Sequence, residues 1–187
     1  PLDSTTAKRA LADGHGLLGE VLGLLDSPAA HKEVATSADT ILRVIGQMQP
    51  RAIVTKFGDN PWLYFYEEFL ASYDPQLRKQ VGAYYTPVEV VRAQVSMVRD
   101  LLINKLGKPA AFADQGVVTL DPAAGTGTYP LGILQSVLES VPNHAAGSVP
   151  ALLRRAADNI YGIEYLIGPY SVAHLRLSRF LAEHGVK

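Results

Sequence analysis

Hydrophobic residues change their spacing in the second half of the chain, and this change predicts a strand followed by a helix. Residues 117–120 (VVTL) are a continuous apolar run rich in β-branched residues, which predicts a buried strand. Beyond the loop at residues 121–127, apolar residues return at helical intervals, which predicts a helix from Tyr129 to about Val141. A short helix at 150–157 and a second strand at 159–164 (NIYGIE) are expected next.

Two further helices flank this pattern. The segment Thr86-Pro87-Val88-Glu89 has the form of a capping box, with threonine at the cap, proline in the first helical position and glutamate in the third. We expect its helix to run to about Leu106 and to end at Gly107, with inward positions Val90, Val91, Val95, Val98, Leu101 and Leu102. The last helix opens at Gly168-Pro169 and ends at Gly185, with an inner face of Tyr170, Ala173, Leu177, Phe180 and Leu181.

The first sixty residues predict a helical region. A helix is expected over residues 3–26, and Ser27-Pro28 is typical of the start of a second one. Either this second helix continues to about Gln49, or a third helix, capped by Ser37, begins there and ends at about Gln49. Residues 50–61 form a connector that contains turn-forming residues.

The segment 62–74 (WLYFYEEFLASYD) carries a stripe of aromatic residues at three- and four-residue intervals. This spacing favours an amphipathic helix that buries the stripe in a core. An aromatic stripe also suits the stacking of nucleic-acid bases, which is the alternative. The cations that follow, Arg78 and Lys79, are interpreted as a solvated face.

These elements together predict an α/β fold, in which a partial Rossmann-like core at residues 61–187 follows the helical region at residues 1–60. The strands near Val117–Asp121 and Ile160–Glu164 should pair in parallel through a right-handed crossover. Such a two-stranded core has exposed sheet edges.

Composition excludes several classes of protein. The 187 residues include no cysteine, so disulfides and thiolate metal sites are excluded and a reducing, cytoplasmic location is expected. The five histidines show no metal-ligand spacing, so no metal site is predicted. No apolar run is long enough for a transmembrane helix. The formal net charge of −1 predicts weak DNA binding by this chain alone.

The loop between the first strand and its helix carries the candidate chemistry. Asp121 ends the strand, and Gly125-Thr126-Gly127 allows a ligand to approach the backbone closely. This is the first half of a nucleotide-binding unit, or an ordinary turn between a strand and a helix. Pro130 occupies the third glycine position of the dinucleotide fingerprint, which argues against that fingerprint. Glu164, at the end of the second strand, is placed to accept hydrogen bonds from ribose hydroxyls, unless it is simply solvated.

Four segments resemble S-adenosylmethionine (AdoMet) methyltransferases that act on adenine N6 in DNA. Residues 121–129 (DPAAGTGTY) resemble their motif I, and residues 82–91 (GAYYTPVEVV) resemble their motif X in the order that this family shows. Residues 161–181 resemble the corresponding segment of type I-like subunits. The run 62–87 is most similar to type ISP restriction-modification enzymes and, closely after them, to phage-defence methyltransferases.

The resemblance implies a site for S-adenosyl-L-methionine across the ends of both strands. Asp121 would lie near the methionine amino group, and the amides of Ala123–Gly127 would line the methionine and ribose. The Thr86 turn would face the cofactor carboxylate, Glu164 would hold the ribose, and the neighbours of Glu164 would flank the adenine. The implied cofactor-binding set is Tyr85, Thr86, Pro87, Asp121, Pro122, Ala123, Gly125, Gly127, Ile163, Glu164 and Tyr165.

The catalytic motif of that family, Asn/Asp-Pro-Pro-Tyr/Phe, does not occur in the sequence, which contains no Pro-Pro pair. The sequence therefore resembles the AdoMet-binding part of a methyltransferase, inactive alone, whose DNA contacts and catalytic loop lie in the remainder of the polypeptide. Two alternatives are a non-catalytic AdoMet-fold module and a dinucleotide-dependent oxidoreductase. Pro130 and the position of the acid make the oxidoreductase the weakest of the three.

Overall fold

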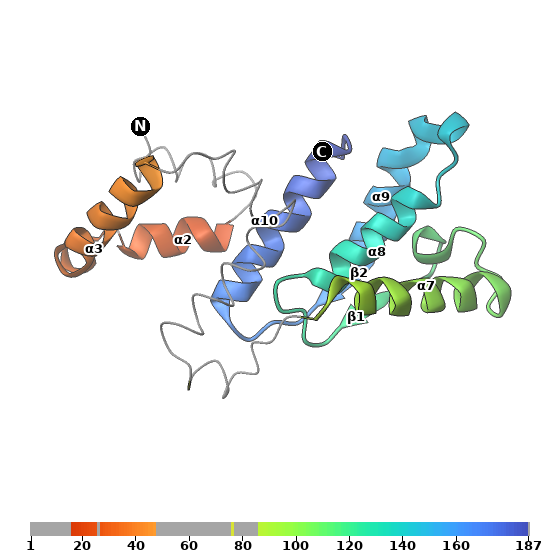
Figure 1. Cartoon of the computed structure of the whole chain (residues 1–187), viewed down its shortest axis with the longest axis horizontal. Helices are drawn as coiled ribbons and strands as arrows, with labels where there is room; N and C mark the ends of the chain where they lie inside the picture. The colour runs from red at the N-terminus through yellow and green to blue at the C-terminus, as the bar shows by residue number, and fades with distance from the viewer. Residues whose placement is uncertain (1–15, 26, 48–75, 77–85, 187) are drawn as a thin grey trace. The chain divides into compact units, whose positions relative to one another are not determined.

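The computed structural model describes residues 16–25, 27–47, 76 and 86–186 (Figure 1). The chain divides into two compact units, Pro1–Phe65 and Tyr66–Lys187. The aromatic segment at 62–74, Arg78, Lys79 and Tyr85 lie outside the described residues. Among the described residues, no helix is long and apolar enough to cross a membrane.

The first unit contains helices α2 (Gly16–Leu25) and α3 (Pro28–Gln47). The Ser27 hydroxyl donates a hydrogen bond to the Leu24 carbonyl oxygen (2.7 Å) and accepts one from the Ala30 amide (3.4 Å). This serine therefore joins the end of α2 to the start of α3, and the predicted start at Ser27-Pro28 is confirmed. Because α3 is continuous through Ser37, there is no separate third helix at that position.

The second unit consists of short strands and helices in alternation. The helices are α7 (Val88–Asn104), α8 (Thr128–Glu139), α9 (Val149–Asp158) and α10 (Ile167–Glu183), with 3-10 turns η1 (Ala111–Ala113) and η2 (Asn143–Ser148). The strands are β1 (Thr119–Asp121) and β2 (Ile160–Gly162). They are adjacent and parallel, with Thr119 opposite Ile160, Leu120 opposite Tyr161 and Asp121 opposite Gly162. The predicted parallel pairing is confirmed, with strands shorter than expected.

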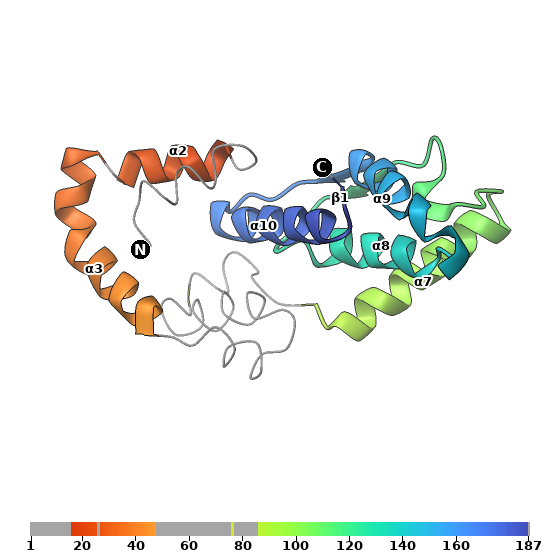
Figure 2. The same ribbon diagram turned by 90° about the horizontal axis from the view of Figure 1, so that it is seen from above.

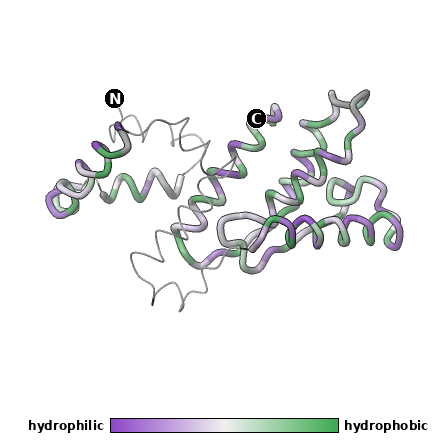
Figure 3. The backbone as a smooth tube through the Cα atoms, in the orientation of Figure 1, coloured by the Kyte–Doolittle hydropathy of each residue, from purple (hydrophilic) through white to green (hydrophobic). Residues whose placement is uncertain are grey.

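Helix α8 is the centre of this unit. It contacts α7, α9, α10 and η1 (Figures 1 and 2), and hydrophobic residues recur along its trace (Figure 3). Its side chains Leu134 and Val137 are almost fully buried, together with Leu153 of α9 and Phe112 of η1. Helix α8, which begins directly after the glycine loop, is therefore held in place by the core, and it anchors the end of that loop.

The predicted capping box is not formed. Pro87, rather than Thr86, is the N-cap of α7, and no side chain caps this end. The amides of Val90 and Val91 both donate to the Pro87 carbonyl oxygen, at 3.0 and 3.1 Å. The helix begins one residue later than the sequence pattern suggests, which places the Thr86 hydroxyl outside the first turn.

We expect Thr86→Ala and Glu89→Ala to change the melting temperature very little, because neither side chain caps α7. If the capping box were formed, Thr86→Ala would instead lower the free energy of unfolding by about 1 kcal/mol. Thermal denaturation followed by circular dichroism measures the difference. A fall of several degrees in the Thr86→Ala variant would show that the hydroxyl does cap the helix.

The inner face of α7 is narrower than predicted, whereas that of α10 differs from the prediction mainly at Tyr170. Val91 and Val95 are buried, whereas Val90, Val98 and Leu101 are 41–48% exposed. The reason is a close approach to α8, where a Cβ atom built on Gly132 would lie 2.9 Å from the Val91 side chain. In α10, Ala173 is buried and Leu177, Phe180 and Leu181 pack against the core, as predicted. Tyr170 is exposed, and its ring is tilted against the His174 ring with centroids 5.5 Å apart.

In the described part of the chain, one face of the sheet packs against the core and the other is exposed. Val118, Leu120, Tyr161 and Ile163 are between 56% and 63% exposed, and the register places Leu120 beside Tyr161. Ile160 lies on the opposite face and packs against the core. The sequence predicted a buried strand, and this is wrong for Val118 and Leu120, although Val117 is buried. Parallel sheets are normally covered on both faces, so this apolar face is suited to further polypeptide.

Candidate functional site

The candidate site lies where β1 and β2 end. The Ile163 amide donates to the Asp121 carbonyl oxygen and the Ala124 amide donates to the Ile163 carbonyl oxygen, both at 2.9 Å. The loop after β1 therefore folds back onto the end of β2. Gly162 permits this contact, because a Cβ atom there would lie 3.1 Å from the Ala124 side chain.

Asp121 holds the first turn of the loop with one oxygen only. Its Oδ1 atom accepts a hydrogen bond from the Ala123 amide at 3.2 Å. Its Oδ2 atom is buried and has no hydrogen-bond partner among the described residues. A buried carboxylate oxygen without a partner is costly, and it is suited to a ligand that carries a positive charge or a donor.

The two glycines of the loop have different reasons to be glycine. Gly127 has φ +76° as the residue before α8, and a Cβ atom on it would lie 3.0 Å from the Ala173 side chain of α10. Gly125 has φ +54°, but a Cβ atom on it would meet only the Ala123 carbonyl oxygen, at 4.0 Å. Gly127 thus permits helix packing, whereas the space around Gly125 is open to a ligand.

Glu164 joins the second strand to the glycine loop. Its Oε2 atom accepts a hydrogen bond from the Gly125 amide at 2.8 Å, and its Oε1 atom accepts one from the Leu166 amide at 2.7 Å. Each oxygen keeps a further lone pair for another donor. The structure therefore brings together Asp121, Gly125 and Glu164, which the sequence placed in one site.

The neighbours of Glu164 form the rim of the site. Ile163 is 59% exposed and Tyr165 is 94% exposed. Pro122 and Ala123 are exposed on the loop. These exposed side chains are accessible to a flat apolar group.

The start of α7 is tied to the start of α8. The Tyr129 hydroxyl donates a hydrogen bond to the Gln94 side-chain oxygen, which links the second turn of α7 to the first turn of α8. Thr86 is half-buried just before α7, and Pro87 is exposed. The two segments predicted to share a ligand therefore lead into helices that are in contact.

Arg176 is a residue that the sequence reasoning missed. It is 8% exposed on α10, and its guanidinium donates to the Thr126 carbonyl oxygen in the loop at 2.6 Å. The available signal was its position three residues after Ala173, on the inner side of an otherwise apolar face.

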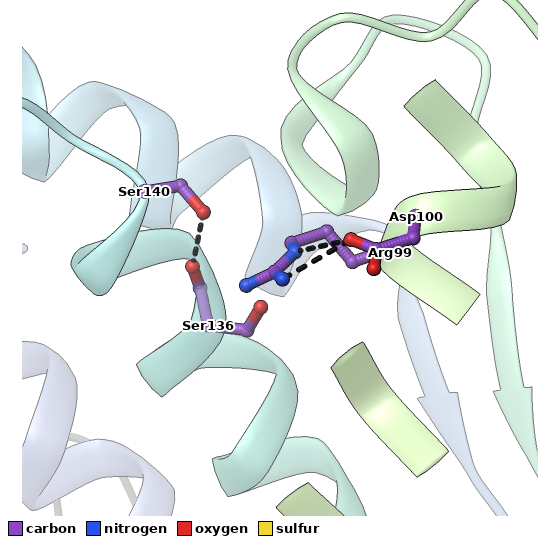
Figure 4. A network of polar contacts seen from close by, with 4 residues as sticks. All are labelled: Arg99, Asp100, Ser136 and Ser140. Carbon is purple, nitrogen blue, oxygen red and sulfur yellow. Dashed lines mark hydrogen bonds and ion pairs between the residues drawn. The ribbon is translucent and has the colours of Figure 1, made fainter. Parts of the chain in front are cut away.

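Elsewhere, a cavity of about 270 Å³ lies between the ends of α7, α8 and η1. Ser136 and Ser140 of its lining are joined by a hydrogen bond from the Ser140 hydroxyl to the Ser136 carbonyl oxygen at 2.6 Å, and Arg99 pairs with Asp100 at 3.1 Å on α7 (Figure 4). Its lining is apolar apart from serine hydroxyls, so it offers no acid or base for chemistry. In the part of the chain that the structure describes, no group of three or more His, Cys, Asp or Glu side chains is arranged to hold a metal.

Comparisons with known proteins give one family and one similar structure. A sequence model of the N-6 DNA methylase family matches residues 58–178. No curated protein sequence matches the chain. The cryo-EM structure of a DrdV–DNA complex is similar to it, with a TM-score of 0.62 and 27% sequence identity over 87% of this chain. The chain spans 15% of the length of that protein chain.

Proposed function

The chain belongs to the N-6 DNA methylase family, and we propose that it is the AdoMet-binding portion of an adenine-N6 DNA methyltransferase from a restriction-modification or phage-defence system. The observation that carries this proposal is the arrangement at the strand ends. There Asp121 at the end of β1 and Glu164 after β2 both hold the glycine loop, in which the space around Gly125 is open. Open α/β sheets bind their ligands at this end of the strands.

The residues of the loop fit AdoMet. The buried Oδ2 atom of Asp121 suits the cationic amino group of the methionine part. The open space around Gly125 admits the methionine and ribose of AdoMet, which the loop amides would line. Glu164 has lone pairs for the two ribose hydroxyls while it holds the loop. When bound, AdoMet supplies an electrophilic methyl group on its sulfonium sulfur.

The other predicted residues complete the proposed site. The N-terminal end of α7, with the Thr86 hydroxyl just before it, is suited to the cofactor carboxylate. Pro87 is the N-cap of that helix. Tyr85 comes directly before Thr86 in the sequence. Ile163 and Tyr165 are exposed beside Glu164 and supply apolar surface for the adenine ring. The amides of Ala123 to Gly127, next to Pro122, would line the methionine and ribose.

The methyl acceptor requires groups that this sequence does not contain. The Asn/Asp-Pro-Pro motif that binds a flipped adenine in the family is absent from it. We propose that the remainder of a longer polypeptide carries this motif and the DNA-binding surface, and covers the apolar sheet face at Leu120 and Tyr161. The similar DrdV chain, whose structure is a complex with DNA, is longer, and this chain spans 15% of it.

The alternative is a module that binds AdoMet without catalysis, and the missing catalytic motif favours it. This alternative predicts the same loop and the same two acids. It differs only in the rest of the polypeptide, where an Asn-Pro-Pro-Tyr sequence would exclude it.

Calorimetric titration of this chain with AdoMet and with NAD tests the proposal. We expect one AdoMet to bind per chain and NAD to produce no binding heat, because Pro130 and the position of Asp121 do not match a dinucleotide site. Binding of NAD in place of AdoMet would contradict the proposed function.

A further inference from the structure

The glycine loop is held by a buried cation from a distant part of the sequence. The Nη1 atom of Arg176 donates to the Thr126 carbonyl oxygen at 2.6 Å. The same atom lies 3.3 Å from the Thr126 hydroxyl and 3.5 Å from the Thr128 hydroxyl. Hydrogen bonds from a charged donor are stronger than neutral ones, so this contact strongly restricts the carbonyl.

Two charged side chains together fix the peptide groups around Thr126. Glu164 accepts from the Gly125 amide on one side, and Arg176 donates to the Thr126 carbonyl on the other. Both charged residues belong to the segment that follows β2. Without them, a loop with glycines at positive φ has many accessible conformations, and a ligand would have to restrict it at the cost of affinity.

We propose that Arg176 is a positioning residue for the AdoMet loop, and this inference rests on the proposed function. Its guanidinium acts through the Thr126–Gly127 peptide group, which it holds in the orientation that starts α8 and leaves the space at Gly125 open. Core packing alone does not account for a buried cation, because an apolar side chain of similar length packs as well without the desolvation cost.

The test compares Arg176→Met, which keeps length and removes the donors, with Arg176→Lys, which keeps the charge. The matched control is Arg179→Met on the same helix, where the side chain is 75% exposed and pairs with Glu183 at 2.7 Å. The measurements are the AdoMet dissociation constant by calorimetry and the hydrogen exchange of the Gly125 and Gly127 amides. The core amide of Leu134 reports global opening.

We expect Arg176→Met to weaken AdoMet binding roughly tenfold and to speed exchange at Gly125 and Gly127 more than at Leu134. Arg176→Lys should restore part of both effects, and Arg179→Met should change neither. Unchanged affinity and loop exchange in Arg176→Met would overturn the inference. So would equal acceleration at Leu134, which would show a purely structural role. A wild-type chain that binds no AdoMet would instead overturn the proposed function, while the loop exchange would still decide the role of Arg176 in the loop.

Discussion

Glu164→Gln is expected to weaken AdoMet binding by about one to two decades. Charge-assisted hydrogen bonds to the ribose hydroxyls are worth roughly 1.5–3 kcal/mol. The glutamine keeps the size of the side chain and removes its charge. Calorimetry with AdoMet measures the loss. Glu183→Gln is the control, because Glu183 lies at the exposed C-terminal end of α10 and pairs with Arg179 at 2.7 Å.

The structure adds a second cost to this substitution. Both carboxylate oxygens of Glu164 accept backbone amides, from Gly125 and from Leu166. A glutamine side chain offers one oxygen and one NH₂ group, so one of these amides must face another donor. We therefore expect a lower melting temperature as well as weaker binding.

An AdoMet analogue that lacks the ribose hydroxyls separates the two costs. If Glu164 binds the hydroxyls, the substitution should weaken AdoMet binding much more than it weakens binding of the analogue. Equal losses for both ligands would mean that Glu164 acts only through the loop, and that its assignment as the ribose acid is wrong.

The sequence predicted the order of elements in the second unit because the spacing of apolar residues changes with each element. The strands near Asp121 and Glu164 pair as expected, and α8 begins within a residue of its predicted start. The start of α7 was wrong by one residue, because several residue types fit a helix start and the tertiary contact with Gly132 sets its position.

Burial was harder to predict than secondary structure. An apolar run such as Val117–Leu120 indicates a strand with two apolar faces, but it does not say which elements cover each face. In the described residues, Val117 is 8% exposed while Val118 and Leu120 are more than half exposed. The pattern describes what a strand is suited to contact, and only the assembled fold says what it does contact.

The site was predictable where backbone conformation demands a residue type, and unpredictable where a distant side chain reaches it. Glycines at positive φ and acids at strand ends leave a clear signal in sequence. Arg176 lies fifty residues from Thr126, and a single arginine on a helix is usually solvated. The roles of all the site residues toward a ligand stay predictions, and Tyr85 lies outside the described residues.

Asp121→Asn is expected to weaken AdoMet binding by about one to two decades without lowering the melting temperature. Asparagine keeps the oxygen that accepts the Ala123 amide, so the turn is retained. It removes the negative charge that would offset the methionine amino group, and its NH₂ group cannot accept from that ammonium. The loss of a charge-assisted hydrogen bond is worth roughly 1.5–3 kcal/mol.

Asp121→Asn is expected to weaken AdoMet binding but not to destabilise the fold, and this combination makes the test specific. The Oδ2 atom of Asp121 is buried without a partner among the described residues, and an uncompensated buried charge costs more than an uncompensated amide. The melting temperature should therefore stay the same or rise. Asp114→Asn is the matched control, because Asp114 accepts the Ala110 amide at 3.1 Å and lies 3.7 Å from the Lys108 ammonium. That variant should lose some stability and keep its AdoMet affinity. A parallel loss of stability and affinity in Asp121→Asn would identify Asp121 as a residue that supports the loop and does not bind the cofactor.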